Sequence, residues 1–311
     1  MKKILLLLTV LFITQVYSAQ SRKAEDPIYA RDQPKAILYF SVEEALEATE
    51  PAELLNLRNK ELQTVPLGIN KLQNLKFLNL MKNSLSELHA EIFDCPELTE
   101  LNIRQNKINE LPKEIGQLKK LEVLNASKNK FTVLPIEIGD LESIKIIHLV
   151  ENNLKYVPSE LGKLKTLNTL ELEKNALNTL PASFKNLKSL VLLNAAQNNF
   201  ESIPKTVFKL RRLESVNFNQ NNLTSIPEDV ARLRKIKTLL LSDNKISSIS
   251  PKICRLKKLE LLNLANNDIR SFPENLHKLK SLKTLILSGN PLTDAERTRV
   301  QEALPGVDIR F

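Results

Sequence analysis

The sequence predicts an α/β solenoid, in which similar coils of chain stack into one elongated domain. The first observation is a pattern that recurs every 23 residues, L-x-x-L-x-L-x-x-N-x-L-x-x-L-P-x-x-I-x-x-L, and is cleanest from Leu98 to Leu118. The second is an asparagine column without insertions, namely Asn83, Asn106, Asn129, Asn152, Asn175, Asn198, Asn221, Asn244, Asn267 and Asn290. A fixed period of this length is typical of solenoids, where each unit contacts only its neighbours.

Each column of the pattern has a physical reason. Leucine and isoleucine at the first, fourth, sixth and eleventh places are expected to point inward and form a continuous core. The L-x-L segment predicts a short strand whose alternate residues face opposite sides. Asparagine offers both a donor and an acceptor, so we interpret its column as a structural ladder that satisfies backbone groups where the chain leaves the strand. The outer segment, such as Pro135 to Leu141, has room for one helical turn or less.

The repeats occupy residues 52–292 as eleven coils, the last of them truncated. Before them, Ser41 and Glu44 form a capping box, which predicts an N-terminal capping helix within residues 41–51, from Val42 to about Ala48. Such a helix would cover the open side of the first coil.

The other end of the repeats carries a similar signal. Thr293 and Glu296 form a second capping box and predict a helix from Asp294 to Ala303. Alternating apolar residues in 307–311 then predict a last strand. Residues 293–311 are therefore expected to form a C-terminal cap.

The N-terminus predicts export. Residues 1–18 resemble a secretory signal peptide, with two early lysines, an apolar run from Ile4 to Val16 and cleavage before Ala19. An uncleaved membrane anchor is the alternative, although the run is short for a bilayer. Residues 19–40 are expected to be a flexible lead-in. We predict a secreted or extracytoplasmic location, in the periplasm or at the cell surface, with no transmembrane segment after signal removal.

The repeat from Ala52 to Phe311 resembles leucine-rich repeats, in the 23-residue L-P-x-x-I-G-x-L form of many bacterial exported proteins and of intracellular scaffolds in plants and animals. The resemblance implies a curved right-handed coil, with a parallel β-sheet on the concave face and short helical or irregular turns on the convex face. It is specific for the fold and leaves the ligand open.

Little in the composition favours catalysis. The chain has three histidines, two cysteines, six glycines and no tryptophan. It contains no recognisable nucleophile–base pair, metal-ligand spacing or glycine-rich phosphate loop. We therefore expect no enzyme activity, cofactor or metal. Cys95 stands in a leucine column, and Cys254 lies seven coils away, beyond disulfide reach.

The concave face is the predicted ligand-binding surface. Its middle place is mostly asparagine, which suits side-chain laddering between coils, the favoured interpretation, or polar recognition of a sugar or peptide backbone. Two apolar groups on this face would indicate an interface if they face solvent, namely Leu54, Phe77 and Met81, then Val123, Ile146 and Val150. The candidate ligand-binding residues are Phe77, Asn79, Met81, Asn102, Arg104, Asn125, Ile146, His148, Val150, Glu171, Glu173 and Asn194.

The net charge of +9 is concentrated in columns just before the strands. In the C-terminal half these columns predict a basic stripe along one edge. The stripe indicates affinity for an anionic surface, or a merely solvated edge, which is the favoured interpretation. Aromatic residues are only 5% of the chain, which argues against a stacking platform for sugars or nucleic acid.

These observations lead to one functional hypothesis with two alternatives. The chain is expected to be a monomeric, non-enzymatic exported protein that binds a protein, or a glycan, through its concave face. The first alternative is an envelope- or wall-associated structural protein held by its basic edge. The second, an intracellular signalling scaffold, requires the signal-peptide prediction to be wrong. Nucleic acid is not an expected partner.

Overall fold

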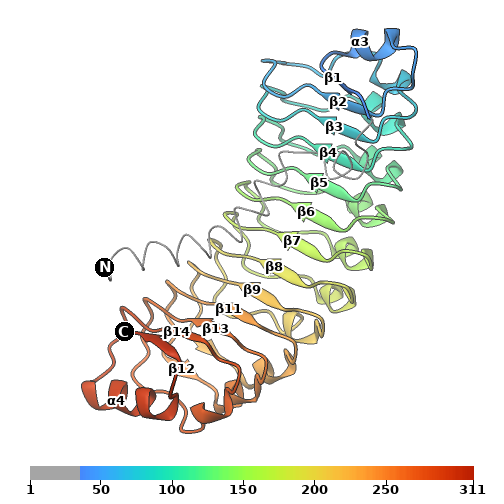
Figure 1. The fold of residues 1–311 in the computed structure, drawn as a ribbon. Coiled ribbons are helices and arrows are strands. Elements are labelled where there is room, and N and C mark those ends of the chain that lie inside the picture. Colours follow the sequence, from blue (N-terminus) through green and yellow to red (C-terminus); the bar gives the residue numbers. More distant parts are fainter. Residues whose placement is uncertain (1–35) are drawn as a thin grey trace.

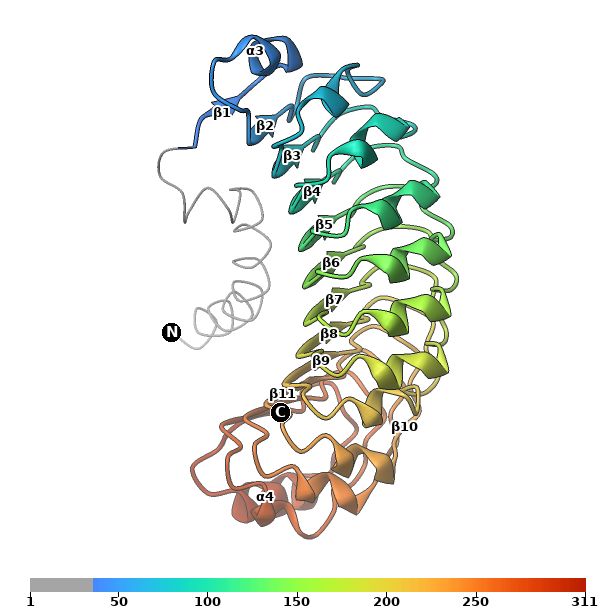
Figure 2. The ribbon, with the colours of Figure 1, turned by 90° about the vertical axis from the view of Figure 1, so that its right-hand side faces the viewer.

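The computed structural model describes residues 36–311, which form a curved solenoid with strands on its inner side and short helical turns on its outer side (Figures 1 and 2). The predicted fold class is confirmed. The predicted signal peptide, 1–18, and most of the lead-in, 19–40, lie outside the described residues.

One parallel sheet of 13 strands runs along the described part of the chain. Within the coils, neighbouring strands pair in a constant register, so that each residue lies opposite the one 23 places further on, as Leu101 does with Leu124. Only the two end strands of the sheet pair at other spacings. The strands of the coils are β2 (Leu54–Asn56), β3 (Phe77–Asn79), β4 (Glu100–Asn102), β5 (Val123–Asn125), β6 (Ile146–His148), β7 (Thr169–Glu171), β8 (Leu192–Asn194), β9 (Ser215–Asn217), β11 (Thr238–Leu240), β13 (Leu261–Asn263) and β14 (Thr284–Ile286).

The outer segments are 3₁₀ helices of three to five residues, slightly longer in places than the single turn expected. They are η1 (Ile69–Lys71), η2 (Ala90–Asp94), η3 (Lys113–Gln117), η4 (Ile136–Asp140), η5 (Ser159–Lys163), η6 (Ala182–Asn186), η7 (Val207–Lys209), η8 (Glu228–Arg232), η9 (Pro251–Arg255) and η10 (Leu276–Lys278). A small parallel pair of strands, β10 (Ser225–Ile226) and β12 (Ser248–Ile249), was not expected from the sequence.

The core lies between the sheet and the outer turns and is continuous from the first coil to the last. Phenylalanines fill the wider places, and the rings of Phe200 and Phe218 meet edge to face with centroids 5.1 Å apart. Both cysteines are buried and free. Burial, together with the carboxylates of Asp94 and Glu91, raises the pKa of the Cys95 thiol to about 12.

The asparagine column forms the predicted ladder. Asn106 Nδ2 donates to the carbonyl oxygens of Leu80, in the preceding coil, and of Ile103, both at 3.0 Å. Its Oδ1 accepts from the amide of Leu85 at 3.1 Å. Each amide side chain therefore joins two coils at the turn that follows the strand, and the same bonds recur, for example, at Asn129 and Asn244.

The residue before each ladder asparagine has a left-handed backbone, although most of these residues are not glycine. Their φ angles lie between 52° and 59°, as at Gln105 (59°) and Gln197 (52°). Gly289 is at this place in the last coil. The turn is thus imposed by the ladder and the strands, against the steric preference of a residue with a Cβ atom.

Helix α3 (Val42–Glu47) covers the N-terminal end of the solenoid (Figure 1). The Ser41 hydroxyl accepts from the Glu44 amide at 3.1 Å, as predicted. The Glu44 carboxylate accepts from the amide of Phe40, the residue before the N-cap, at 3.1 Å. The expectation of a flexible lead-in up to residue 40 is wrong at its end. There, β1 (Leu38–Tyr39) pairs with β2, because that strand otherwise has a free edge.

At the other end, α4 (Asp294–Ala303) begins at Thr293, whose hydroxyl accepts from the Glu296 amide at 3.2 Å. Glu296 also accepts from the Phe272 amide at 2.6 Å, which fastens the helix to the preceding coil. A hydrogen bond from Arg299 lowers the pKa of the Glu296 carboxyl. The last strand, β15 (Asp308–Arg310), pairs in parallel with β14 and closes the sheet.

Candidate functional site: the concave face of the sheet

The concave face consists of the strand residues on either side of the central inward leucine. In β4, Leu101 is buried in the core, whereas Glu100 and Asn102 project to the opposite side of the sheet. The constant register repeats this arrangement from coil to coil, so that rows of like positions run along the inner curve (Figure 2). The sheet therefore presents the predicted site residues on one surface.

The asparagine row on this face does not form the expected side-chain ladder between coils. Instead, Asn102 Oδ1 accepts from the Arg104 amide at 3.1 Å, and Asn125 Oδ1 accepts from the Ser127 amide at 3.2 Å. The same bond to the amide two residues on occurs at Asn56, Asn79, Asn194, Asn217 and Asn263. The prediction fails because the side chain of an asparagine at a strand end lies closer to the backbone amides of its own turn than to the asparagine of the next coil.

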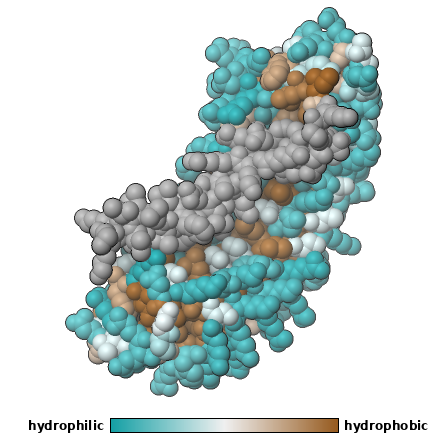
Figure 3. Space-filling view, in the orientation of Figure 1, coloured by the Kyte–Doolittle hydropathy of each residue, from teal (hydrophilic) through white to brown (hydrophobic). Residues whose placement is uncertain are grey.

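The first apolar group, Leu54, Phe77 and Met81, does not face solvent. It therefore lacks the solvent exposure that would have indicated an interface. Phe77 and Met81 are only 3% and 2% exposed, and Leu54 is equally covered. All three lie outside the continuous core, on the other side of the sheet from it. The second group, Val123, Ile146 and Val150, is half-buried. In Figure 3, hydrophobic side chains gather on this face near both ends of the solenoid.

The middle of the face carries a polar cluster that joins three strands. His148 Nδ1 lies 2.6 Å from Glu171 Oε2, and both side chains are 9% exposed. The Glu173 carboxylate accepts from Asn194 Nδ2 at 2.8 Å and from Gln197 Nε2 at 3.2 Å. The two glutamates therefore have different partners and do not act as a carboxylate pair.

Three further residues belong to this surface: Glu100, which the sequence placed on the face but not among the candidate site residues, and two that the sequence did not indicate. Glu100 is buried in the row that holds Phe77, and Gln197 contacts Glu173. The Ser127 hydroxyl accepts from the Val150 amide at 3.2 Å. Their membership of the same columns was the signal that could have identified them.

A charged rim borders the cluster at the left-handed turn. Glu151 lies between two lysines, with Nζ–Oε distances of 3.2 Å to Lys174 and 3.5 Å to Lys128. Burial alone would raise the pKa of the Glu151 carboxyl, but the hydrogen bonds and charges of the two lysines outweigh it and lower the pKa. Arg104 is half-buried nearby on the same side of the sheet. The rim thus offers both signs of charge beside the half-buried apolar group.

Neither metal nor membrane chemistry is visible in the described residues. Within 36–311, no three or more His, Cys, Asp and Glu side chains are grouped so as to hold a metal ion. No helix in that range combines the length and apolar character needed to cross a membrane. The geometry defines a rigid, mixed polar and apolar surface, which is the property of a binding scaffold.

The class of protein defined by this fold and surface is a solenoid binding scaffold. Leucine-rich repeat family models match residues 73–131, 96–154, 193–246 and 234–292, which together cover more than half of the chain. The chain belongs to the leucine-rich repeat family. Its members are typically non-enzymatic and bind proteins.

Solved structures give the same picture. A leucine-rich repeat protein of Leptospira interrogans is 29% identical, with a TM-score of 0.51 and 84% of both chains covered. The ectodomain of the Arabidopsis thaliana receptor kinase GASSHO1/SCHENGEN3, solved with Casparian strip integrity factor 2, is 26% identical, with a TM-score of 0.66. That match covers 79% of this chain and 33% of the receptor chain.

A Listeria monocytogenes internalin, at 22% identity and a TM-score of 0.64, shares the fold; the match covers 80% of this chain and 77% of the internalin. Among curated proteins, none matches the chain.

Proposed function

We propose that this chain is an exported, non-enzymatic protein that captures a protein ligand through its concave face. The observation that carries the proposal is the surface across β5 to β8, where the half-buried residues Ile146 and Val150 lie beside the His148–Glu171 pair. Half-buried apolar residues flanked by fixed polar groups are the usual composition of the energetically dominant part of an interface.

A protein ligand suits this surface better than a small molecule does. The sheet and the ladder hold the face in one shape, so binding costs little ordering of the scaffold. The face extends over the strands of successive coils, and it mixes apolar groups with both signs of charge. The receptor ectodomain solved with its integrity factor supports a protein or peptide ligand by similarity. A glycan remains the alternative ligand for the same face.

Export rests on the signal-peptide pattern of residues 1–18 and on the extracellular nature of similar ectodomains. Cell fractionation followed by N-terminal sequencing tests it. A processed chain beginning at Ala19 in the periplasm, medium or cell surface is the expected result. Unprocessed chain confined to the cytoplasm would contradict export and favour the intracellular scaffold.

The binding face is tested with a double variant, Ile146→Ser with Val150→Ser, in the chain from Ala19 to Phe311. Both residues lie outside the continuous core. The control is Ile136→Ser with Tyr156→Ser, which makes similar changes at outer residues that are 59% and 55% exposed.

Partners are captured from envelope or host extracts, identified by mass spectrometry, and measured again with each purified variant. The concave variant is expected to keep its melting temperature and lose the partner, whereas the control keeps both. Retained binding by the concave variant would place the interface elsewhere. Cooperative unfolding of that variant would show that the two residues support the core.

A further inference from the structure

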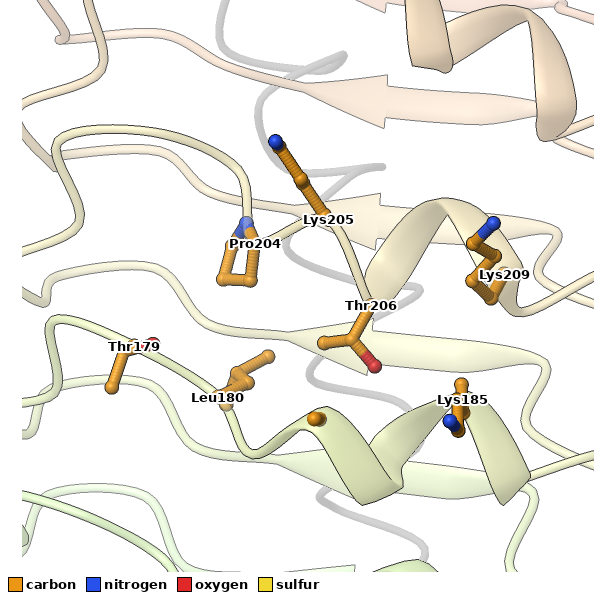
Figure 4. A pocket seen from close by; sticks show the side chains of 8 residues that line it. Thr179, Leu180, Lys185, Pro204, Lys205, Thr206 and Lys209 are labelled. Carbon is orange, nitrogen blue, oxygen red and sulfur yellow. The ribbon is translucent and has the colours of Figure 1, made fainter.

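The outer surface has a hollow of about 340 Å³ between η6 and η7. Its walls come from two successive coils, and Figure 4 shows Leu180 and Lys185 on one side with Pro204, Thr206 and Lys209 on the other. The hollow is separate from the concave face, so a binding role for it is independent of the proposed function.

The hollow lies where a glycine column of the outer turns, Gly116, Gly139 and Gly162, ends. A Cβ atom added at Gly139 would lie 2.5 Å from the backbone oxygen of Glu160, and one at Gly162 would lie 2.6 Å from that of Ser183. Glycine thus lets successive outer turns touch. In the next coil this place is Lys185, which lies below Thr206 in Figure 4. Here η7 packs less closely on η6 than the preceding outer turns pack on one another.

Thr206 shows the consequence. In the preceding coil, at the equivalent position, the Ser183 hydroxyl donates to the carbonyl oxygen of Ser159 at 2.6 Å. The corresponding carbonyl for Thr206 belongs to Ala182, across the hollow. The Thr206 hydroxyl is instead the one buried side-chain polar atom in residues 36–311 that lacks a hydrogen-bond partner, and the residue is 9% exposed. Figure 4 shows this hydroxyl directed toward η6. An unpaired buried hydroxyl is costly, so a ligand that bonds to it gains affinity.

The hollow is also strongly basic. Lys185, Lys205 and Lys209 line it, and in Figure 4 their amino groups lie around Thr206, two above it and one below. No ion pair of these three lysines occurs with any residue in the described range. Lysine ammonium groups on flexible stems adapt readily to an anion, while the stems themselves, with Leu180 and Pro204, provide apolar walls.

Lys209 is also the first member of an exposed basic row that continues over the next three coils. The row repeats a basic–Leu–basic pattern, and its members are Lys209, Arg211, Arg212, Arg232, Arg234, Lys235, Arg255, Lys257, Lys258, Lys278 and Lys280. Glu214 and Glu260, the acidic residues next to the row, pair with Lys237 and Lys283, which are not members of it. Within the row, only Arg232 forms an ion pair with a residue of the described range, namely Asp229. The row therefore keeps its positive field, at a repeat of about 4.8 Å per coil.

We propose that the hollow and the basic row together form a binding site for an anionic polysaccharide, with one sulfate- or phosphate-bearing sugar seated in the hollow. The sugar ring packs against Leu180 and Pro204, and its anionic group accepts bonds from the lysines. Rotation about the Cα–Cβ bond of Thr206 turns its hydroxyl toward this group. Further anionic groups of the polymer lie along the row.

A polysaccharide fits better than other polyanions do. No aromatic side chain lines the hollow for stacking nucleic-acid bases. No large apolar side chain is exposed between residues 209 and 280 to insert into a bilayer. The solenoid that carries the row is curved (Figure 2), and a flexible linear polymer follows a curved surface more fully than a flat membrane does.

The test uses the full chain and a heparin oligosaccharide, with affinity measured by calorimetry at several salt concentrations. Lys185→Gly restores the glycine column, closes the hollow and is expected to weaken binding about tenfold. Arg211→Ser with Arg234→Ser should weaken it at least as much and reduce the salt dependence. The control, Lys119→Ser with Lys165→Ser, changes the same column in the N-terminal half and should leave affinity unchanged.

Thr206→Val separates a binding role from a structural one. The variant removes an unpaired hydroxyl, so the melting temperature is expected to rise slightly while heparin affinity falls. Full heparin affinity in both Thr206→Val and Lys185→Gly would overturn the role of the hollow. Equal binding of neutral dextran, equal losses in the Lys119/Lys165 control, or tighter binding to phosphatidylglycerol vesicles than to heparin would overturn the proposal as a whole.

Discussion

Two columns of asparagine run along the same coils, four residues apart, and they have different structural roles. The ladder column, represented by Asn129, joins consecutive coils through bonds to Ile103 and Ile108 in the coil before it. Asn125, in the concave column, bonds to the Ser127 amide within its own turn. The left-handed residue Lys128 lies between them.

The difference shows that residue type and period do not by themselves assign a role. Asn129 stands where the chain has turned away from the strand, so unpaired backbone groups of two coils surround its amide. Asn125 stands at the end of a strand whose backbone is already paired with both neighbouring strands. The first column therefore stabilises the stack of coils, and the second shapes the surface that a ligand meets.

The largest expected contrast compares the two sides of one strand. Leu170→Ala, in the core of β7, should lower the free energy of unfolding by about 2–5 kcal/mol, because it opens a cavity in a packed interior. Thr169→Ala, on the concave side, should cost about 0.5 kcal/mol or less. Chemical denaturation with the two purified variants measures both. Equal losses would show that the side-chain register is misassigned.

The two asparagine columns themselves give the next contrast. Asn129→Ala removes the acceptor of the buried Ile108 amide and the donor to two carbonyls, which should cost about 1–3 kcal/mol. Asn125→Ala loses one local bond and should cost about 1 kcal/mol or less. Urea unfolding measures the difference, provided that the free energy of unfolding falls with urea concentration at the same slope in both variants. If Asn125→Ala lowered the free energy of unfolding as much as Asn129→Ala does, the asparagines of the concave face would also hold the coils together.

The smallest effect concerns the turn between the columns. Gln105 is exposed and has a φ of 59°, a conformation that glycine adopts without steric cost. Gln105→Gly should raise the free energy of unfolding by about 0.5 kcal/mol, with part of the gain offset by the more flexible unfolded chain. Gln105→Ile should lower it by about 1 kcal/mol, since a β-branched residue resists this region more strongly. Thermal unfolding of both variants is the measurement, and a glycine variant less stable than the isoleucine variant would contradict the explanation.

Much of the fold could be predicted because every coil repeats the same local chemistry. The asparagine ladder, the inward leucines and the two capping boxes each require only a short segment and its copy 23 residues away. The β1 strand was missed because its two residues, Leu38–Tyr39, carry no repeat signal and are ordered by the edge of β2. The convex pair of β10 and β12 was missed for a different reason: its residues lie 23 apart within the repeats, but the same places in the other coils form no strand.

The candidate site was less predictable than the fold. The columns placed His148, Glu171 and Glu173 on one face, but they did not predict which of the two carboxylates pairs with the histidine. They also left Phe77 and Met81 as exposed candidates, whereas both side chains are covered. Pairing and coverage depend on rotamers and on neighbours from other coils, which a column pattern does not contain.

The sequence by itself determined the solenoid, its 23-residue register and its basic edge, because these depend on periodic burial and on charge counted along columns. Only the tertiary structure decided how closely the coils approach one another. The change from Gly162 to Lys185 in one column looks like an ordinary surface substitution in sequence. In three dimensions the same change adds a side chain where neighbouring turns would touch, and it leaves the Thr206 hydroxyl without a partner beside three lysines.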